Sequence, residues 1–326
     1  MSQPTPAAAS RASFSAAELV SDQDLSSSDL ALLLEAAAHI RTEPAAYRQS
    51  LQGRTLVLLF EKPSLRTRVT FEVAMKGLGG DAIYYDCRSE PLGQRETVAD
   101  VARNLERWVD CIAARTFRQS TVEELAHWAK IPVINALSDR YHPCQALADI
   151  LTVKDVFGRL MGIKLAYVGD GNNVAHSLLL TGAKAGLSSA VATPPSYEPD
   201  PEIVRIASEI ASQTGGSVQV GDDPAEAVAG AHVVYTDVWA SMGSEQEAET
   251  RRQRFAPFRV TEGLFSKARS EAIFLHCLPA HRGEEVEAAV IDSPRSAVFH
   301  QAENRLHAQK ALLWLLLAQG TAKDGN

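Results

Sequence analysis

The sequence predicts an α/β fold with two doubly wound parallel-sheet domains joined by long helices. Apolar runs of four to six residues alternate with helical patterns along most of the chain, as expected for parallel strands that helices cover on both faces. The alternation begins again after one long helical pattern near residue 153. A chain of 326 residues is also longer than one ordinary core needs, so two domains are the simplest division.

The first half predicts four strands. Residues 1–25 are expected to form a disordered tail, because the opening is rich in Ala, Ser and Pro and has too few arginines for a transit peptide. Ser28 and Asp29 would cap a helix at residues 30–41. The predicted strands occupy residues 55–60, 82–85, 111–114 and 131–135. The predicted helices occupy residues 67–77, 96–108 and 122–129, and the first of them stops at Gly79-Gly80.

The second half repeats this architecture without repeating the sequence. A helix at residues 144–157, with the sequence CQALADILTVKDVF, leads into it. The predicted strands occupy residues 164–168, 188–193, 217–221, 232–236 and 272–275. The predicted helices occupy residues 174–185, 201–213 and 224–229. A last helix at residues 302–318 offers Leu306, Leu312, Leu313 and Leu316 for packing.

The composition argues against several classes of protein. The chain has 32 Lys and Arg against 40 Asp and Glu, whereas a nucleic-acid-binding protein usually carries a basic face. The apolar run at residues 311–318 is too short to span a bilayer. Four cysteines without a CxxC pair favour a reducing cytoplasm over a disulfide-stabilised secreted protein.

Cations gather after the first predicted strand, in the sequence EKPSLRTRVTFE. A strand end, a short loop and a helix start expose backbone N–H groups and the positive end of the helix dipole, where anions bind. Ser64 and Thr67 add hydroxyl groups, and Arg66 adds a planar guanidinium that suits phosphate. The alternative is a solvated loop with surface arginines. The position at the carboxyl end of a parallel strand favours the anion site.

Two further strand ends carry polar side chains. Arg115 follows the third predicted strand, where a surface ion pair would explain it equally well. His142 and Gln145 lie on either side of Pro143 at a predicted helix start, and the proline itself is structural. The two side chains can donate to an oxygen and accept from an N–H, which suits a carbonyl or carboxamide group.

In the second half, the turn Gly169-Asp170-Gly171-Asn172-Asn173 is similar to part of a dinucleotide-binding motif. Val174 occupies the third glycine position and no acidic residue ends the next strand, so a dinucleotide site is rejected. The turn is expected to present its asparagine amides instead. Asp237 ends a later strand and would suit a ligand ammonium, although an Asp there could also cap the next segment.

His276 and Cys277 close the last predicted strand. Neighbours in a strand point to opposite faces, so these two do not form a Cys–His nucleophile pair. A zinc site that combines them with His142 and Cys144 is also disfavoured, because neither pair has a usual ligand spacing. We therefore expect no metal and no cofactor.

Together these motifs resemble the aspartate/ornithine carbamoyltransferase family, and more narrowly its ornithine-specific members. They are, in order, FEKPSLRTRVTFE, the Arg of AARTF, HPCQALADILT, GDGNNVAHSL, DVWASMGSE, FLHCLPAHRGEEV and AENRLHAQKALL. The resemblance runs from about residue 50 to the last helix. It implies transfer of the carbamoyl group of carbamoyl phosphate to the side-chain amine of L-ornithine, which gives L-citrulline and phosphate.

The resemblance also implies an organisation of the chain. Residues 1–152 would bind carbamoyl phosphate, residues 153–301 would bind ornithine, and residues 302–326 would form a helix that returns to the first domain. A cytoplasmic homotrimer, or an assembly of trimers, with a role in arginine biosynthesis would follow. No nucleic-acid or membrane partner is implied.

Two sets of site residues follow from the resemblance. The carbamoyl phosphate set comprises Ser64, Leu65, Arg66, Thr67, Arg115, His142, Gln145, Cys277, Leu278 and Arg305. The ornithine set comprises Asn173, Asp237, Ser241 and Met242. The catalytic residues among them would be Arg66, Arg115, His142, Asp237 and Cys277.

Two loops depart from the family's pattern. Leu65 stands where a Thr is commonest, which removes a hydroxyl but keeps the backbone donor. Pro91 stands where many bacterial members have a Gln that reaches carbamoyl phosphate, possibly across a subunit boundary, and Gln94 replaces a frequent Arg. Both residues are therefore left out of the predicted site.

Other interpretations are open. Putrescine would leave Asn173 without a carboxylate, N-acetylornithine would leave Asp237 without an ammonium, and aspartate would need further cations. Of other classes, a nicotinamide-dependent dehydrogenase conflicts with Val174. A non-enzymatic binding or regulatory subunit conflicts with the complete set of polar groups.

Overall fold

The computed structural model describes residues 13–239 and 248–318 of the chain. This part divides into two compact units. The first unit holds the described residues up to Leu147 and those from Arg305 onward, and the second holds those from Ala148 to Asn304. Both divisions fall inside helices, α6 (Pro143–Phe157) and α13 (Val298–Leu317).

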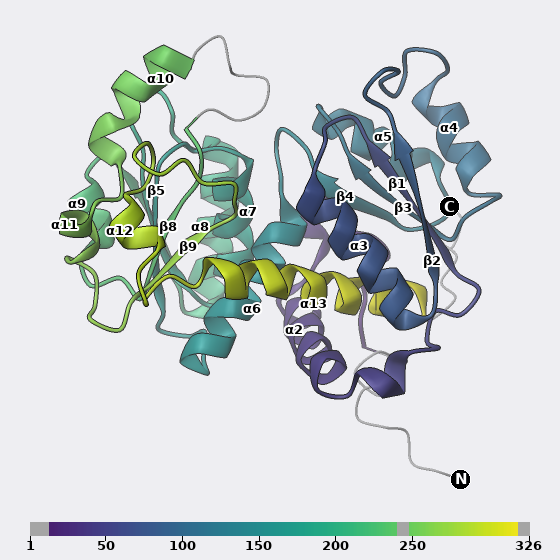
Figure 1. The fold of residues 1–326 in the computed structure, drawn as a ribbon, viewed down its shortest axis with the longest axis horizontal. Helices are drawn as coiled ribbons and strands as arrows, with labels where there is room; N and C mark the ends of the chain where they lie inside the picture. Colours follow the sequence, from purple (N-terminus) through teal and green to yellow (C-terminus); the bar gives the residue numbers. More distant parts are fainter. Residues whose placement is uncertain (1–12, 240–247, 319–326) are drawn as a thin grey trace. The chain divides into compact units, whose positions relative to one another are not determined.

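The first unit is built on a four-stranded parallel sheet (Figure 1). Its strands are β1 (Thr55–Phe60), β2 (Asp81–Asp86), β3 (Cys111–Arg115) and β4 (Val133–Leu137). Their order in the sheet is β2-β1-β3-β4, so the winding direction reverses between β1 and β3. The carboxyl ends of strands at such a reversal commonly bind ligands. The prediction of parallel strands is confirmed.

Helices cover both faces of this sheet. Besides parts of α6 and α13, the first unit contains η1 (Asp22–Asp24), α2 (Ser27–Thr42), η2 (Pro44–Tyr47), α3 (Leu65–Leu78), α4 (Val98–Leu105) and α5 (Gln119–Trp128). Alternate strand side chains such as Val57 and Leu59 join α4 and α5 in one buried cluster. Figure 1 shows α3 on the other side of the sheet. Burial on both faces explains why the strand runs are apolar at nearly every position.

The C-terminal helix belongs largely to the first unit. From Arg305 onward α13 is lined with buried leucines, and Trp314 packs edge-on against Tyr47 with ring centroids 5.3 Å apart. Arg305 also donates a hydrogen bond to Thr67 of α3. The predicted return of this helix to the first domain is confirmed.

The second unit contains a five-stranded parallel sheet. Its strands are β5 (Lys164–Val168), β6 (Ser188–Ala192), β7 (Ser217–Gly221), β8 (Val233–Thr236) and β9 (Ile273–His276), in the order β7-β6-β5-β8-β9. The winding direction reverses between β5 and β8. Besides parts of α6 and α13, the described helices of this unit are α7 (Asn173–Lys184), α8 (Pro201–Thr214), α9 (Pro224–Val228), α10 (Ala248–Phe255), η4 (Ala256–Phe258), α11 (Glu262–Phe265) and α12 (Ala288–Ile291). Of these, α9, α11 and α12 pack on one face of the sheet, and α7 and α8 lie on the other (Figure 1).

Two expectations about the N-terminal region are wrong. Residues 13–25 are not a disordered tail, because buried Leu19 pairs with β4: its N–H donates to the Val133 carbonyl at 2.9 Å, and its own carbonyl accepts from Asn135 at 2.7 Å. The following helix is capped by Ser26 rather than by Ser28. Ser26 and Asp29 form a reciprocal capping box, which moves the helix start to Ser27.

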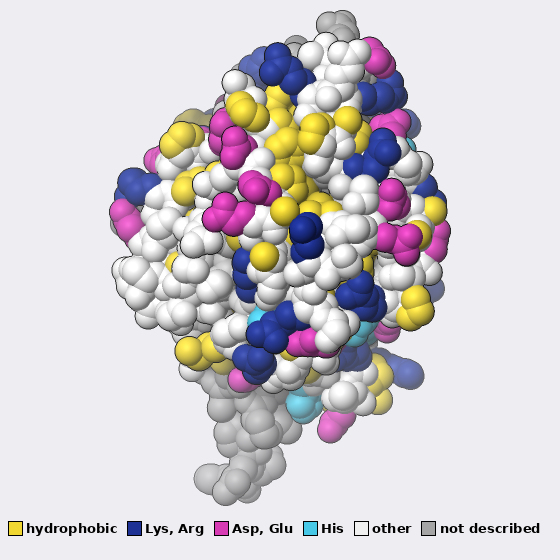
Figure 2. Space-filling model, turned by 90° about the vertical axis from the view of Figure 1, so that its left-hand side faces the viewer, with side chains coloured by type: hydrophobic (Ala, Val, Ile, Leu, Met, Phe, Trp, Pro, Cys, Tyr) yellow, Lys and Arg dark blue, Asp and Glu magenta, His cyan; other side chains and the backbone are white. Residues whose placement is uncertain are grey.

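The surface carries charges of both signs. Figure 2 shows Lys and Arg side chains interspersed with Asp and Glu on the face that it draws. Among the described helices, none combines the length and the apolar character that crossing a bilayer requires.

Candidate functional site

The loops after β1, β3 and β4 meet at the carboxyl edge of the first sheet. The N–H of Glu61 donates to the carbonyl of Arg115 at 2.9 Å, and the N–H of Thr116 donates to the carbonyl of Leu137 at 2.9 Å. The register shifts between Ala114 and Arg115, so a β-bulge redirects the last side chain of β3. Arg115, predicted to follow the strand, is instead its final residue.

The anion-binding segment forms the start of α3. Ser64 is the N-cap, since its hydroxyl oxygen accepts from the N–H of Thr67 at 3.3 Å and its hydroxyl lies 3.0 Å from the Thr67 hydroxyl. The cap moves the helix start from the predicted residue 67 to Leu65, whose side chain is 77% exposed. Leu65 therefore offers the site its backbone rather than its side chain. The N-terminus of this 14-residue helix supplies positive partial charge at the sheet edge.

Arg305 connects two other predicted residues within the first unit, Gln145 and Thr67. One terminal nitrogen, Nη1, donates to Oε1 of Gln145 at 2.8 Å, and the other, Nη2, donates to the hydroxyl of Thr67 at 2.9 Å. Arg305, Gln145 and Thr67 are each at most 3% exposed. A guanidinium buried in this way ties α13 to the first turns of α3 and α6.

The ring of His142 is buried and lies near the guanidinium groups of three arginines. Burial lowers its pKa well below the usual range, and the nearby guanidinium groups of Arg305, Arg115 and Arg66 lower it further. The imidazole is therefore neutral near pH 7. Since the guanidinium groups of all three arginines act on this one ring, their charges lie in the same part of the first unit. Cations around a neutral donor and acceptor suit a ligand with an anionic end and a carbonyl end.

Glu61 is part of this edge and was missed by the sequence analysis. Its buried carboxylate accepts from the N–H of Leu92 at 2.9 Å and from the N–H of Phe117 at 2.7 Å. It thereby joins the loop after β2, which contains Pro91, to the segment directly after Arg115. Only its place beside Lys62 in the motif could have drawn attention to it.

The second unit brings together a carboxylate, an amide and a thiol at the β5/β8 reversal. Oδ2 of buried Asp237 accepts from the amide of Asn172 at 2.9 Å. Oδ1 accepts from the N–H of Val238 at 2.8 Å and from the thiol of Cys277 at 2.9 Å. This arrangement holds a negative charge at the carboxyl edge of the sheet, where a ligand ammonium could bind.

Asn172 has a larger role than the sequence indicated. It is the N-cap of α7, and its Oδ1 accepts from the N–H groups of Val174 and Ala175. Asn173, the predicted ligand residue, is the first residue of the helix and is half-buried. Ser241 and Met242 lie outside the described residues.

The predicted carbamoyl phosphate residues divide between the units. Eight of the ten lie in the first unit, whereas Cys277 and Leu278 lie in the second. Cys277 contacts Asp237, which the prediction had assigned to the other substrate.

Two clusters in the second unit have donors close enough for a metal: Asp237, His276 and Cys277, and His281, Glu284 and Glu285. In the first, both ring nitrogens of His276 already make hydrogen bonds, to Leu278 and Glu285. A histidine needs a lone pair to ligate a metal, so this cluster does not fit one as it stands.

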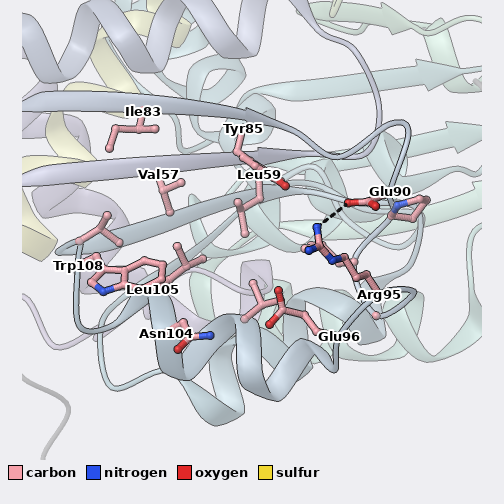
Figure 3. A pocket seen from close by; sticks show the side chains of 15 residues that line it. Val57, Leu59, Ile83, Tyr85, Glu90, Arg95, Glu96, Asn104, Leu105 and Trp108 are labelled. Atoms are coloured by element: carbon pink, nitrogen blue, oxygen red, sulfur yellow. Dashed lines mark ion pairs between the residues drawn. The ribbon is translucent and has the colours of Figure 1, made fainter.

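A groove of about 380 Å³ opens elsewhere in the first unit, between α4 and the strands β1 and β2 (Figure 3). Figure 3 shows Val57, Leu59 and Ile83 across from Leu105 and Trp108, with the ion pair of Glu90 and Arg95 at one end. Its lining residues include Pro91 but none of the predicted site residues.

Two family models match the chain. The model described as the carbamoyl-P binding domain of aspartate/ornithine carbamoyltransferase matches residues 17–155, and the Asp/Orn binding domain matches residues 161–316. An ornithine carbamoyltransferase from Parafrankia sp. is 54% identical over 308 residues, which are 94% of this chain and 97% of the relative. Another, from Anoxybacillus flavithermus, is 58% identical over 267 residues, which are 82% and 85% of the two chains.

Solved structures agree in fold. The ornithine carbamoyltransferase from Pyrococcus furiosus has a TM-score of 0.90 and 50% identity, over 93% of this chain and 98% of its own. The ornithine transcarbamoylase from Giardia lamblia has a TM-score of 0.85 and 36% identity, over 95% and 99% of the two chains.

Proposed function

Because the chain belongs to the aspartate/ornithine carbamoyltransferase family, we propose that it transfers the carbamoyl group of carbamoyl phosphate to the side-chain amine of L-ornithine. The products are L-citrulline and phosphate. The observation that carries this function is the convergence of Arg66, Arg115 and Arg305 on neutral His142. Ornithine as the acceptor is supported by the buried carboxylate of Asp237 and by the two ornithine carbamoyltransferases that are 54% and 58% identical to this chain over the aligned residues.

Carbamoyl phosphate binds at the N-terminus of α3. Its phosphate lies against the helix N–H groups at Leu65 and Arg66, and the guanidinium groups of Arg66 and Arg115 balance its charge. The carbamoyl end reaches His142 and Gln145, whose neutral side chains can donate and accept hydrogen bonds. Arg305 completes the pocket and fixes the orientation of Gln145.

Ornithine binds at the β5/β8 edge. The α-ammonium is attracted to Asp237, and the α-carboxylate accepts from Asn173 at the positive end of α7. Ser241 and Met242 belong to the same set. Since the thiol of Cys277 donates to Asp237, the thiol and the ammonium share one carboxylate, and the ornithine side chain can extend past the sulfur.

The chemistry is an addition followed by an elimination. The side-chain amine attacks as the neutral base, although nearly all of it is ammonium in water at pH 7. The new C–N bond turns the carbamoyl oxygen into an oxyanion, which Arg115, His142 and the Thr67 hydroxyl stabilise; losing one such donor typically costs ~10²–10³ in rate. The C–O bond to phosphate then breaks, and phosphate takes the proton that the amine nitrogen releases. No covalent enzyme intermediate is needed for this balance.

A panel of acceptors tests the function. Purified chain is incubated with carbamoyl phosphate and ornithine, putrescine, N-acetylornithine or aspartate in turn, and ureido product and phosphate are both measured. We expect equal amounts of citrulline and phosphate with ornithine, and little product with the other amines. If putrescine, N-acetylornithine or aspartate is turned over faster than ornithine, ornithine is not the preferred acceptor and the proposed function is wrong in that respect.

We also propose that the chain assembles as a homotrimer and that the groove in Figure 3 is where copies meet. Its walls are apolar, and Trp108 and Tyr85 in it are 71% and 53% exposed, which is typical of interaction surfaces. The groove is also lined by Pro91, at the position where many bacterial members of the family have a Gln whose contact with carbamoyl phosphate the sequence analysis relates to a subunit boundary.

Sedimentation of two variants tests this surface. Trp108→Asp should shift the chain from trimer toward monomer, because a charge would be buried at the contact. Phe299→Asp changes a side chain of similar exposure, 75%, outside the groove and should leave the trimer intact. If the Trp108→Asp variant is still a trimer, the groove is not the contact between copies. If the wild-type chain is a monomer, the proposed trimer is wrong.

A cytoplasmic location is the last part of the proposal. Its support is that none of the four cysteines, all of which lie in the described residues, forms a disulfide, and Cys87, Cys111 and Cys144 are buried. Unpaired thiols are usual in a reducing compartment. Recovery of the protein outside the cytoplasmic fraction of its cells would contradict this location.

A further inference from the structure

The segment after β9 adopts a conformation that needs support. Leu278 has a φ of +58°, in the left-handed region that bulky side chains rarely adopt. Such a residue persists only where its surroundings hold it. The segment carries Cys277, whose thiol contacts Asp237 at 2.9 Å. The placement of that thiol therefore depends on whatever holds Leu278.

The ring of His276 holds the backbone of Leu278. The N–H of Leu278 donates to Nδ1 of His276 at 2.9 Å. A backbone N–H can only donate, so Nδ1 must carry a lone pair rather than a proton. The neutral ring then carries its proton on Nε2, the nitrogen that faces away from Leu278. This tautomer follows from the geometry of one hydrogen bond.

The carboxylate of Glu285 accepts a hydrogen bond from the other ring nitrogen of His276, Nε2. Oε1 of Glu285 lies 3.2 Å from Nε2 of His276, and both side chains are 0% exposed. The same oxygen accepts from the N–H of His281 at 2.5 Å. Oε1 therefore accepts from the ring of His276 and from the backbone N–H of His281. Oε2 makes no hydrogen bond to any described residue.

We propose that Glu285 is a positioning residue for the transfer reaction: through the Nε2–H tautomer of His276 it fixes the backbone of Leu278 and thereby the thiol of Cys277 beside Asp237. The inference rests on the proposed function for its kinetic consequence, but not for its geometry. Glu285 touches neither substrate in this account. It acts through the hydrogen bond that its Oε1 accepts from Nε2–H of His276, and His276 in turn accepts the N–H of Leu278 at Nδ1.

Two substitutions of Glu285 distinguish the effect of its hydrogen-bond acceptor from the effect of its negative charge. Glu285→Gln keeps an oxygen that can accept from His276 and His281, so turnover should stay close to that of the wild type. Glu285→Ala removes the acceptor, and kcat should fall roughly ten- to hundredfold, since small misplacements of reacting groups have effects of that size. Glu284→Ala makes the same change one residue earlier, at a half-buried side chain that faces Arg252, and should leave kcat unchanged.

The kinetics are measured where circular dichroism shows each variant folded. Equal losses in Glu285→Gln and Glu285→Ala, or no loss in either, would overturn the proposal, because the acceptor oxygen would then not matter. A merely structural role would lower the melting temperature of both variants without the difference in kcat between them.

The tautomer is tested without any turnover. In the wild-type protein labelled with ¹⁵N-histidine, two-dimensional ¹H–¹⁵N spectra at pH 7 distinguish the two neutral tautomers and the imidazolium, and His276→Gln identifies the signal. We expect the proton on Nε2. A proton on Nδ1, or on both nitrogens, would overturn the inference even if Glu285→Ala failed to fold. Absence of citrulline formation would instead count against the proposed function alone.

Discussion

At the scale of single residues, the proposed anion site depends on the three arginines that act on His142. Arg66 differs from its neighbour Arg68, although both belong to the same motif. Arg68 pairs with Glu72 at 2.8 Å and stacks over Tyr84 at 3.8 Å, whereas Arg66 acts on His142. The sequence analysis assigned Arg66 alone to the anion, and the separate partners of Arg68 agree with leaving Arg68 out.

Arg66→Ala should lower kcat/KM by roughly 10²–10³ with every amine, because a donor to the developing charge is lost. Arg68→Ala is the matched control and should stay within about twofold, as surface substitutions usually do. Steady-state kinetics with carbamoyl phosphate varied at saturating ornithine measure both. A similar loss in the two variants would mean that the motif acts through its net charge and not through one residue.

The lowered pKa of His142 also predicts how stability depends on pH. Below about pH 6.5 the unfolded chain binds a proton that the buried ring does not accept, so the free energy of unfolding falls as the pH drops. The contribution of this one group approaches about 1.4 kcal/mol per pH unit below that point. Urea titrations at several pH values measure it, and the slope should be smaller by that amount in His142→Gln. An unchanged slope would show that His142 is protonated in the folded state.

Asp237 is expected to discriminate between the substrates. Asp237→Asn keeps the size of the side chain but removes the charge that holds the ammonium, and leaving a buried charge without its partner costs about 3–5 kcal/mol. We therefore expect kcat/KM for ornithine to fall by roughly 10²–10³. Calorimetric affinity for carbamoyl phosphate should remain near the wild-type value. Equal losses for the two substrates would contradict the division of roles.

At the scale of elements, both proposed sites lie at strands between which the strand order reverses. The strands β1 and β3 end at Phe60 and Arg115, and β5 and β8 end at Val168 and Thr236. Sequence patterns predicted these strands to within one or two residues, because apolar runs and flanking turns are local signals. They did not predict the strand order, which depends on contacts between distant segments. From sequence patterns, each motif could be placed at the end of a strand. The patterns did not show that these strand ends lie side by side at one edge of a sheet.

Glu61 shows what local patterns miss at this scale. A glutamate next to Lys62 is unremarkable in sequence, yet its carboxylate ties two loops to the sheet edge. Short helices such as α11 and α12 were missed for a related reason: four residues contain no helical period to detect. Ser26 was missed as a cap because two serines follow it and only the geometry distinguishes them.

Glu61→Gln should weaken carbamoyl phosphate binding. A glutamine can accept from only one of the N–H groups of Leu92 and Phe117, and leaving a buried donor unsatisfied costs about 1–3 kcal/mol. We expect part of that cost to appear as an increase of about tenfold in the dissociation constant, measured by calorimetry. Glu90→Gln, in the same loop but at a surface ion pair with Arg95, is the control and should bind normally. Normal binding by Glu61→Gln would show that Glu61 supports the fold alone.

At the scale of the whole molecule, the two units have separate sheets, and the chain passes between them within α6 and α13. The sequence predicted two domains because the strand and helix pattern starts twice. The contribution of Arg305 could be inferred only from the family resemblance, since no local pattern links residue 305 with residue 67. Assembly is likewise absent from residue patterns, because exposed Trp108 looks like any surface aromatic until the groove around it is seen.

The most direct measurement is a calorimetric titration of carbamoyl phosphate into the purified, folded chain without any amine. If the loops of the first unit bind carbamoyl phosphate, heat should be released or absorbed until about one equivalent per chain has bound. The Arg66→Ala variant should give no such signal. A wild-type chain that gives no heat and shows no binding by equilibrium dialysis would contradict the account.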